Sequence, residues 1–211
     1  MANIIFDFDG TIADSFEVIV SIIKKLTHAE DDFTEASIYE LRQLPIKSIM
    51  KKLNIYPWQL PLLLLRGRVM MRRRINEIKL FNGIVKTIEE LHAEGHNLFI
   101  VSSNSPHNVV GFLKKHRLEE IFVDIEGNVS LFGKEKALAK LLKKNSLNPR
   151  ETWYVGDELR DIDAALATEL RSIAVTWGFT EKNALASHRP TALAERPTDI
   201  MTILNDSSII P

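Results

Sequence analysis

The sequence predicts an α/β protein built on a parallel sheet, with a small helical insertion. From Gly83 onwards, apolar runs alternate with amphipathic segments, a pattern typical of parallel strands covered by helices on both faces. Residues 15–80 instead have helical periodicity and no convincing strand. We therefore expect a core domain made of residues 1–14 and 81–211, and a helical cap domain made of residues 15–80.

The composition indicates a chain with one sizeable core. The chain has 211 residues, of which 45% are hydrophobic, enough apolar material to fold without crosslinks. It contains no cysteine, which excludes disulfides, thiolate metal sites and a cysteine nucleophile. Lys and Arg number 27 against 28 Asp and Glu, so the net charge of -1 gives no general attraction to nucleic acid or membranes.

Targeting and membrane segments are not expected. The apolar run at Leu62–Leu65 is far shorter than the roughly 20 residues that a membrane helix needs. The first strand begins at Asn3, which leaves no room ahead of it for a signal peptide. We therefore expect a soluble, cytoplasmic protein.

Prolines divide the helical insertion. Breaks at Pro45, Pro57 and Pro61 predict three to five helices, with Asp32 and Thr34 as candidate N-caps. The insertion leaves the core directly after the first strand and its turn, and it returns at residues 81–83. It can therefore lie over the end of that strand as a lid.

The core elements follow from apolar runs and turn residues. Further strands are expected at residues 97–101, 121–125, 152–155 and 172–176, and helices at residues 84–94, 107–115, 134–144, 161–168 and 199–205. Residues 207–211 are expected to form a loose tail.

Two acids follow the first strand. Asp7 and Asp9 are two residues apart, so both would project from one face at its carboxyl end, where open α/β sheets place their active sites. Like charges this close raise one pKa unless a cation neutralises them, and we interpret that cation as a metal. The alternative is an ordinary Asp9-Gly10 turn.

Three more polar clusters follow later strands. Ser102 and Ser103 come just before a helix and could bind a phosphoryl oxygen. Lys134 begins a helix, where the helix dipole disfavours a cation. Asp157 ends a strand, and Asp161 follows one helical turn later. Helix capping is an alternative for the serines and for Asp157, but it does not explain why these groups occur together.

The order and spacing of these clusters resembles the haloacid dehalogenase-like superfamily of aspartate-nucleophile phosphatases. Its four motifs match Asp7-Phe8-Asp9-Gly10-Thr11, Ser102, Lys134 and Gly156-Asp157-Glu158-Leu159-Arg160-Asp161. The resemblance covers nearly the whole chain and implies a Rossmann-like core with a helical cap after the first motif. Residues 175–179 resemble the phosphoglycolate phosphatase-like members.

The resemblance implies a covalent mechanism. Asp7 would attack phosphorus to form an aspartyl-phosphate, and Asp9 would protonate the leaving alcohol and then activate water. Mg²⁺ would be held by Asp7, the Asp9 carbonyl and Asp157. The implied partner is a small phosphorylated metabolite, such as phosphoglycolate or a sugar phosphate.

The remaining motif residues would bind phosphate or support the site. Ser102 and the Ser103 N–H would hold phosphate oxygens, and Lys134 would stabilise the charge shared by phosphate and Asp7. Thr11 and Asp161 would orient their neighbours. Ser103 replaces Ser102 in the second motif if the strand runs one residue further.

Two features of the sequence keep other interpretations open. Thr168-Glu169 stands where relatives commonly have Ala-Gly, which affects the conformation of that turn. The cluster Arg66, Arg68, Arg72, Arg73 and Arg74 is interpreted first as a solvated helix face. Alternatively, one or two of these arginines bind an anionic substrate, or the patch contacts a polyanion. A phosphosugar mutase or a catalytically silent regulatory protein would use the same core. The substrate and the oligomeric state do not follow from the sequence.

Overall fold

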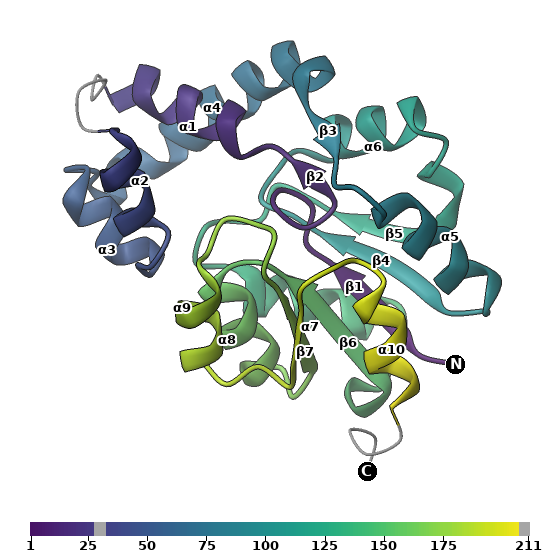
Figure 1. The fold of residues 1–211 in the computed structure, drawn as a ribbon. Helices are drawn as coiled ribbons and strands as arrows, with labels where there is room; N and C mark the ends of the chain where they lie inside the picture. The colour runs from purple at the N-terminus through teal and green to yellow at the C-terminus, as the bar shows by residue number, and fades with distance from the viewer. Residues whose placement is uncertain (28–32, 207–211) are drawn as a thin grey trace.

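A parallel sheet of six strands forms the centre of the computed structural model, which describes residues 1–27 and 33–206 (Figure 1). The strand order is β5 (Phe122–Glu126), β4 (Asn97–Val101), β1 (Asn3–Phe6), β6 (Thr152–Gly156), β7 (Arg171–Val175) and β8 (Ala192–Ala194). Ile5 of β1 lies opposite Phe99 of β4 and Tyr154 of β6. The predicted α/β fold class is confirmed.

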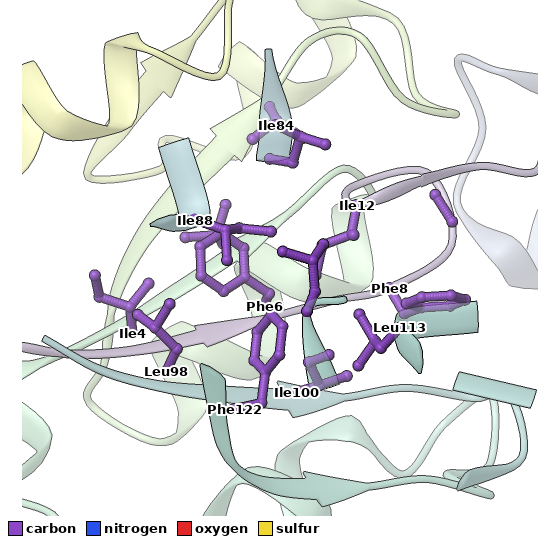
Figure 2. Packing of buried hydrophobic residues seen from close by; sticks show 14 of the residues in the cluster. Ile4, Phe6, Phe8, Ile12, Ile84, Ile88, Leu98, Ile100, Leu113 and Phe122 are labelled. Carbon is purple, nitrogen blue, oxygen red and sulfur yellow. The ribbon is translucent and has the colours of Figure 1, made fainter. Parts of the chain in front are cut away.

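Alternate residues of β1 face two different helical layers. Ile4 and Phe6 belong to the larger hydrophobic cluster, which is shown in Figure 2 and is completed by α5 (Ile84–Ala93), α6 (Pro106–Lys115) and α10 (Asp199–Asn205). Ile5 instead packs against α7 (Lys134–Lys144) and α8 (Leu159–Ala167). The side-chain period of two thus buries both faces of the strand.

Within the described part of the insertion, the helices α1 to α4 form the cap (Figure 1). They are α1 (Phe16–Thr27), α2 (Glu35–Leu41), α3 (Ile46–Lys52) and α4 (Leu60–Arg74). A small hydrophobic cluster around Phe33, Leu41 and Leu53 gives the cap a core of its own. Thr34 is the N-cap of α2, as expected, and accepts a hydrogen bond from the Ser37 N–H at 3.2 Å. Asp32 lies outside the described residues, as does the expected tail at 207–211.

Short 3₁₀ helices complete the connections. They are η2 (Pro57–Gln59), η3 (Ile75–Glu77), η4 (Glu119–Ile121) and η5 (Pro149–Glu151).

Across residues 1–27 and 33–206, no helix combines the length and apolar character needed to cross a bilayer.

The expectation that residues 15–80 contain no strand is wrong at their end. β3 (Lys79–Leu80) pairs antiparallel with β2 (Ala13–Asp14), where the chain enters and leaves the cap. Two residues are too few to give a recognisable pattern. The domain boundaries at residues 14 and 80 stay a prediction. The pair of strands β2 and β3 lies at both of these boundaries.

The sequence also gave no signal for two elements near the C-terminus. These are α9 (Lys182–Ser187) and the edge strand β8. β8 consists of Ala-Leu-Ala, which lacks the β-branched residues typical of strands, and it is defined by its pairing with β7.

The turn after α8 predicts a stabilising substitution. Glu169 is exposed and has a φ of +58°, a left-handed conformation that costs an L-residue free energy and that glycine adopts without strain. Glu169→Gly is therefore expected to raise the free energy of unfolding by about 0.5–1 kcal/mol. Urea denaturation measures this change. Glu169→Ala is the control, because it removes the charge and keeps the Cβ, and an equal gain from it would contradict the explanation.

Candidate active site

Asp7 extends β1 by one residue at its carboxyl end. Its N–H donates to the Val155 carbonyl at 2.8 Å, which continues the ladder with β6 and fixes the backbone. The carboxylate is buried; Oδ1 accepts the Phe8 N–H at 2.8 Å, and Oδ2 lies 2.6 Å from the Nζ of Lys134. The strand end therefore presents a carboxylate in contact with a cation.

A tight turn follows and brings Asp157 against the first motif. Gly10 has a φ of +85°, and a Cβ added to it would lie 2.1 Å from Oδ2 of Asp157. Only glycine fits this close approach. Thr11 donates its hydroxyl to Oδ1 of Asp157 at 2.8 Å, and the Phe179 N–H donates to Oδ2 at 2.7 Å.

Asp9 has a different environment from Asp7. Its Oδ2 accepts the side-chain amide of Asn104 at 3.0 Å, while its buried Oδ1 has no hydrogen-bond partner among the described residues. Burial raises the pKa of Asp9, and the neighbouring Ser15 hydroxyl and the Asn104 amide oppose that rise. No residue of the described chain forms an ion pair with Asp9, so its protonated form is more favourable than that of a solvent-exposed aspartate.

Lys134 connects the acids of two motifs. It begins α7, is buried, and contacts both Asp7 and Asp161. Burial lowers the pKa of Lys134, but the carboxylates of Asp161 and Asp7 outweigh this and hold the pKa above its usual value. Asp161 also accepts the Tyr154 hydroxyl at 3.1 Å and the Glu158 N–H at 2.9 Å. These ion pairs explain why a lysine is tolerated as the first residue of α7, where the helix dipole disfavours a cation.

The two serines of the second motif have different contacts. β4 ends at Val101, so buried Ser102 is the residue that closes the strand; its Oγ accepts the Asn104 N–H at 3.0 Å. Ser103 Oγ accepts from Nη1 of Arg160 at 3.1 Å. The N-cap of α6 is Ser105 rather than either of these serines. Capping therefore does not account for Ser102 or Ser103.

Capping does not account for Asp157 either. The N-cap of α8 is Glu158, which forms a capping box with Asp161. Burial, followed by the negative charges of Glu158, Asp7 and Asp161, raises the pKa of Asp157 well above its usual value. A buried carboxyl surrounded by acids indicates a place where positive charge is needed.

The donor set fits a divalent cation. Asp7, Asp157, Glu158 and Asp161 face two cations, Lys134 and Arg160, so the fully ionised group carries two excess negative charges. Burial raises the pKa of Asp7 to about 7 despite the opposing effect of Lys134. Carboxylate oxygens are the ligands that Mg²⁺ prefers.

The carboxylates that lie closest together are not the metal ligands that the sequence predicts. Oxygens of Asp7, Glu158 and Asp161 lie within 4.8 Å of one another. Asp157 is not in this group, because its oxygens face Thr11 and Phe179. The set of Asp7, the Asp9 carbonyl and Asp157 stays a prediction, with Glu158 as a nearby additional carboxylate.

A cleft of about 650 Å³ separates the cap from these residues. Its floor includes Asp7, Asp9, Ser102 and Lys134, and its walls are mainly apolar side chains from the cap. Apolar walls lower the local dielectric, which strengthens electrostatic interactions between groups on the floor.

Arg42 of the cap closes one side of the cleft. Its Nε donates to the Phe179 carbonyl at 2.9 Å and its Nη2 to the Gly178 carbonyl at 3.0 Å. Nη1 lies 3.2 Å from the carboxylate of Glu181. The cap is thus bonded to the same loop that donates to Asp157.

The structure brings the predicted residues together and adds others. Asp7, Asp9, Ser102, Ser103 and Lys134 line one cleft. Behind this lining, Asp161 contacts Lys134, and Asp157 accepts hydrogen bonds from Phe179 and Thr11. The sequence indicated Asn104 only as one member of a polar cluster at residues 102–106, and it indicated no individual role for Asn104, Glu158 or Arg160. The last two lie within the fourth motif, and that position was the only signal for them.

Comparisons with known proteins agree with this geometry. The family model for haloacid dehalogenase-like hydrolases matches residues 4–175. A phosphoglycolate phosphatase from Synechococcus elongatus is 34% identical over 205 residues, which are 95% of this chain and 96% of that protein. Pyrophosphatase PpaX from Anoxybacillus flavithermus is 26% identical, with 98% of each chain covered.

Solved structures have the same fold. A predicted phosphatase from Clostridium acetobutylicum superposes with a TM-score of 0.81 at 23% identity, over 98% of this chain and 100% of that one. A haloacid dehalogenase-like family protein from Streptococcus pneumoniae gives 0.78 at 22% identity, over 97% and 99%. With a family model that spans most of the sequence, the chain belongs to the haloacid dehalogenase-like hydrolases.

Proposed function

We propose that the chain is a Mg²⁺-dependent phosphatase that hydrolyses a small phosphomonoester through an aspartyl-phosphate on Asp7. The observation that supports this best is the contrast between two neighbouring acids. Asp7 contacts the ammonium group of Lys134, whereas Asp9 accepts a hydrogen bond from the Asn104 amide and has no ion-pair partner among the described residues. Such a difference in environment divides the roles of nucleophile and proton donor between two carboxyl groups.

The reaction would take place in two steps. In the first, a carboxylate oxygen of Asp7 attacks phosphorus, the bond from phosphorus to the leaving oxygen breaks, and Asp9 gives its proton to that oxygen. In the second, Asp9 takes a proton from water while the water attacks phosphorus, which releases inorganic phosphate and the Asp7 carboxylate. Water attack distinguishes this reaction from that of a mutase, in which a second sugar hydroxyl accepts the phosphoryl group.

The surrounding residues would hold the phosphoryl group. The Ser102 hydroxyl and the Ser103 N–H would bind its oxygens, and Lys134 would stabilise the charge shared with Asp7. Mg²⁺ would be held by Asp7, the Asp9 carbonyl and Asp157, with Thr11 and Asp161 as supports. The chemistry supplied by the bound ion is charge neutralisation and alignment of the phosphate. The relative from Synechococcus elongatus makes phosphoglycolate the first substrate to test.

The nucleophile is tested by assaying phosphate release from a panel of phosphomonoesters, with and without Mg²⁺. Wild type is expected to need the metal. Asp7→Asn is expected to lose activity by at least about 10³-fold, because an amide cannot form the intermediate. Undiminished activity in chelator or in this variant would refute the mechanism, and transfer of phosphate to a sugar would favour the mutase.

The proton donor is tested by changing the leaving group. Asp9→Asn is expected to slow hydrolysis of alkyl phosphates by about 10²–10⁴-fold. Hydrolysis of p-nitrophenyl phosphate should fall far less, since nitrophenolate leaves without a proton. Single-turnover kinetics on both substrates measures this. Equal losses on the two substrates would show that Asp9 is not the acid.

The buried charge of Asp7 predicts the pH dependence of stability. In chelator, the pKa of Asp7 is about 7 in the folded chain, against 3.8 for an unperturbed aspartate, so the folded state keeps a proton that the unfolded chain releases. The free energy of unfolding should therefore fall as pH rises from about 4 to 7. Asp7→Asn should reduce that fall by about 2–4 kcal/mol, as measured by urea denaturation. Identical pH profiles would contradict this assignment.

A further inference from the structure

The basic residues of the cleft differ in how their charge is balanced. Arg42 pairs with Glu181, Lys134 with Asp7 and Asp161, and Arg160 with Glu158. The cleft is also lined by Lys47 and Arg68, and neither has an ion-pair partner among the described residues. These two cations are the ones available to a ligand.

Arg68 is the one next to the phosphate-binding serines. Its Nε donates to the Ser103 carbonyl at 2.9 Å, and its Nη2 lies 3.4 Å from the Val129 carbonyl. Lys47 instead lies over the Phe132 ring, 5.8 Å from its centroid. The guanidinium of Arg68 is thus held at the core side of the cleft, beside the second motif, although it belongs to the cap.

The backbone of Arg68 is fixed as well. Asn108 of α6 donates its side-chain amide to the Arg68 carbonyl at 3.1 Å, and the same amide donates to Asn104 at 2.8 Å. Asn104 in turn donates to Asp9. One chain of hydrogen bonds therefore orients both the proposed acid and the helical turn that carries Arg68.

The carbonyl contacts leave the positive charge of Arg68 uncompensated. Partial burial lowers its pKa, yet an arginine remains protonated at neutral pH. The transferred phosphoryl group already has Lys134 and the proposed metal as partners, and most of the remaining wall is apolar. A substrate with an uncharged body would leave this partly buried cation without a counterion.

We propose that Arg68 binds a second anionic group of the substrate, a carboxylate or a further phosphoryl group that is not transferred. This inference rests on the proposed phosphatase function and narrows its substrate class to small phosphate compounds with two anionic groups. A guanidinium binds such groups bidentately, which gives orientation as well as affinity. The proposal also assigns a role to one arginine of the cluster at residues 66–74.

The test compares 2-phosphoglycolate, which carries a carboxylate, with ethyl phosphate, which does not. Arg68→Met is expected to lower kcat/KM for 2-phosphoglycolate by about 30-fold, mainly through KM, because it removes a charge-assisted contact. The effect on ethyl phosphate should stay within about 3-fold. Arg73→Met on the exposed side of the same helix is the matched control and should change neither value.

Arg68 also connects the cap to the core, and the two substrates separate that role from recognition. Equal losses on both would mean that Arg68 only positions the cap, and this result would overturn the proposal. If wild type hydrolyses neither compound, the proposed function fails, and calorimetric binding decides the inference separately. Tighter binding of 2-phosphoglycolate than of ethyl phosphate, lost in Arg68→Met, would support it, and equal binding of the two would refute it.

Discussion

The ammonium group of Lys134 is the interaction on which the site depends. It joins a carboxylate that follows β1 to one on α8, and it does so from the first residue of α7. Removing the cation would leave buried negative charges without compensation, a change that typically costs about 3–5 kcal/mol. The relative positions of β1, α7 and α8 therefore depend on the charge of Lys134. The neighbouring acids are tolerated for the same reason, since each additional carboxylate increases the demand for positive charge.

The central part of the fold could be predicted because local signals and tertiary structure agree there. The four later strands that the sequence predicts lie within one residue of their expected positions, since each contains apolar residues that pack into the core. β8 and β3 could not be found in this way. Their residues gain strand conformation from pairing with β7 and β2, which single-sequence patterns do not contain.

The same distinction applies to the site. Short side chains at strand ends were predictable, because the carboxyl ends of parallel strands share one edge, and Asp7, Ser102 and Asp157 follow from that alone. The positions of long side chains could not be predicted in this way. Arg68 is one of five arginines on α4, and its direction depends on which face of the helix meets the core. The leucines of α4 do not identify that face, because they occur on both sides of the helix: Leu63 and Leu64 line the cleft, whereas Leu62 and Leu65 are exposed.

The contacts of Arg42 have a mechanical consequence for substrate entry. The peptide at Gly178 and Phe179 accepts hydrogen bonds from the cap through its carbonyls and donates one to Asp157 through the Phe179 N–H. A cap that moves away from the core would break those two hydrogen bonds, and it would do so on the peptide that donates to Asp157. The position of the cap and the support of this acid are therefore linked through one loop.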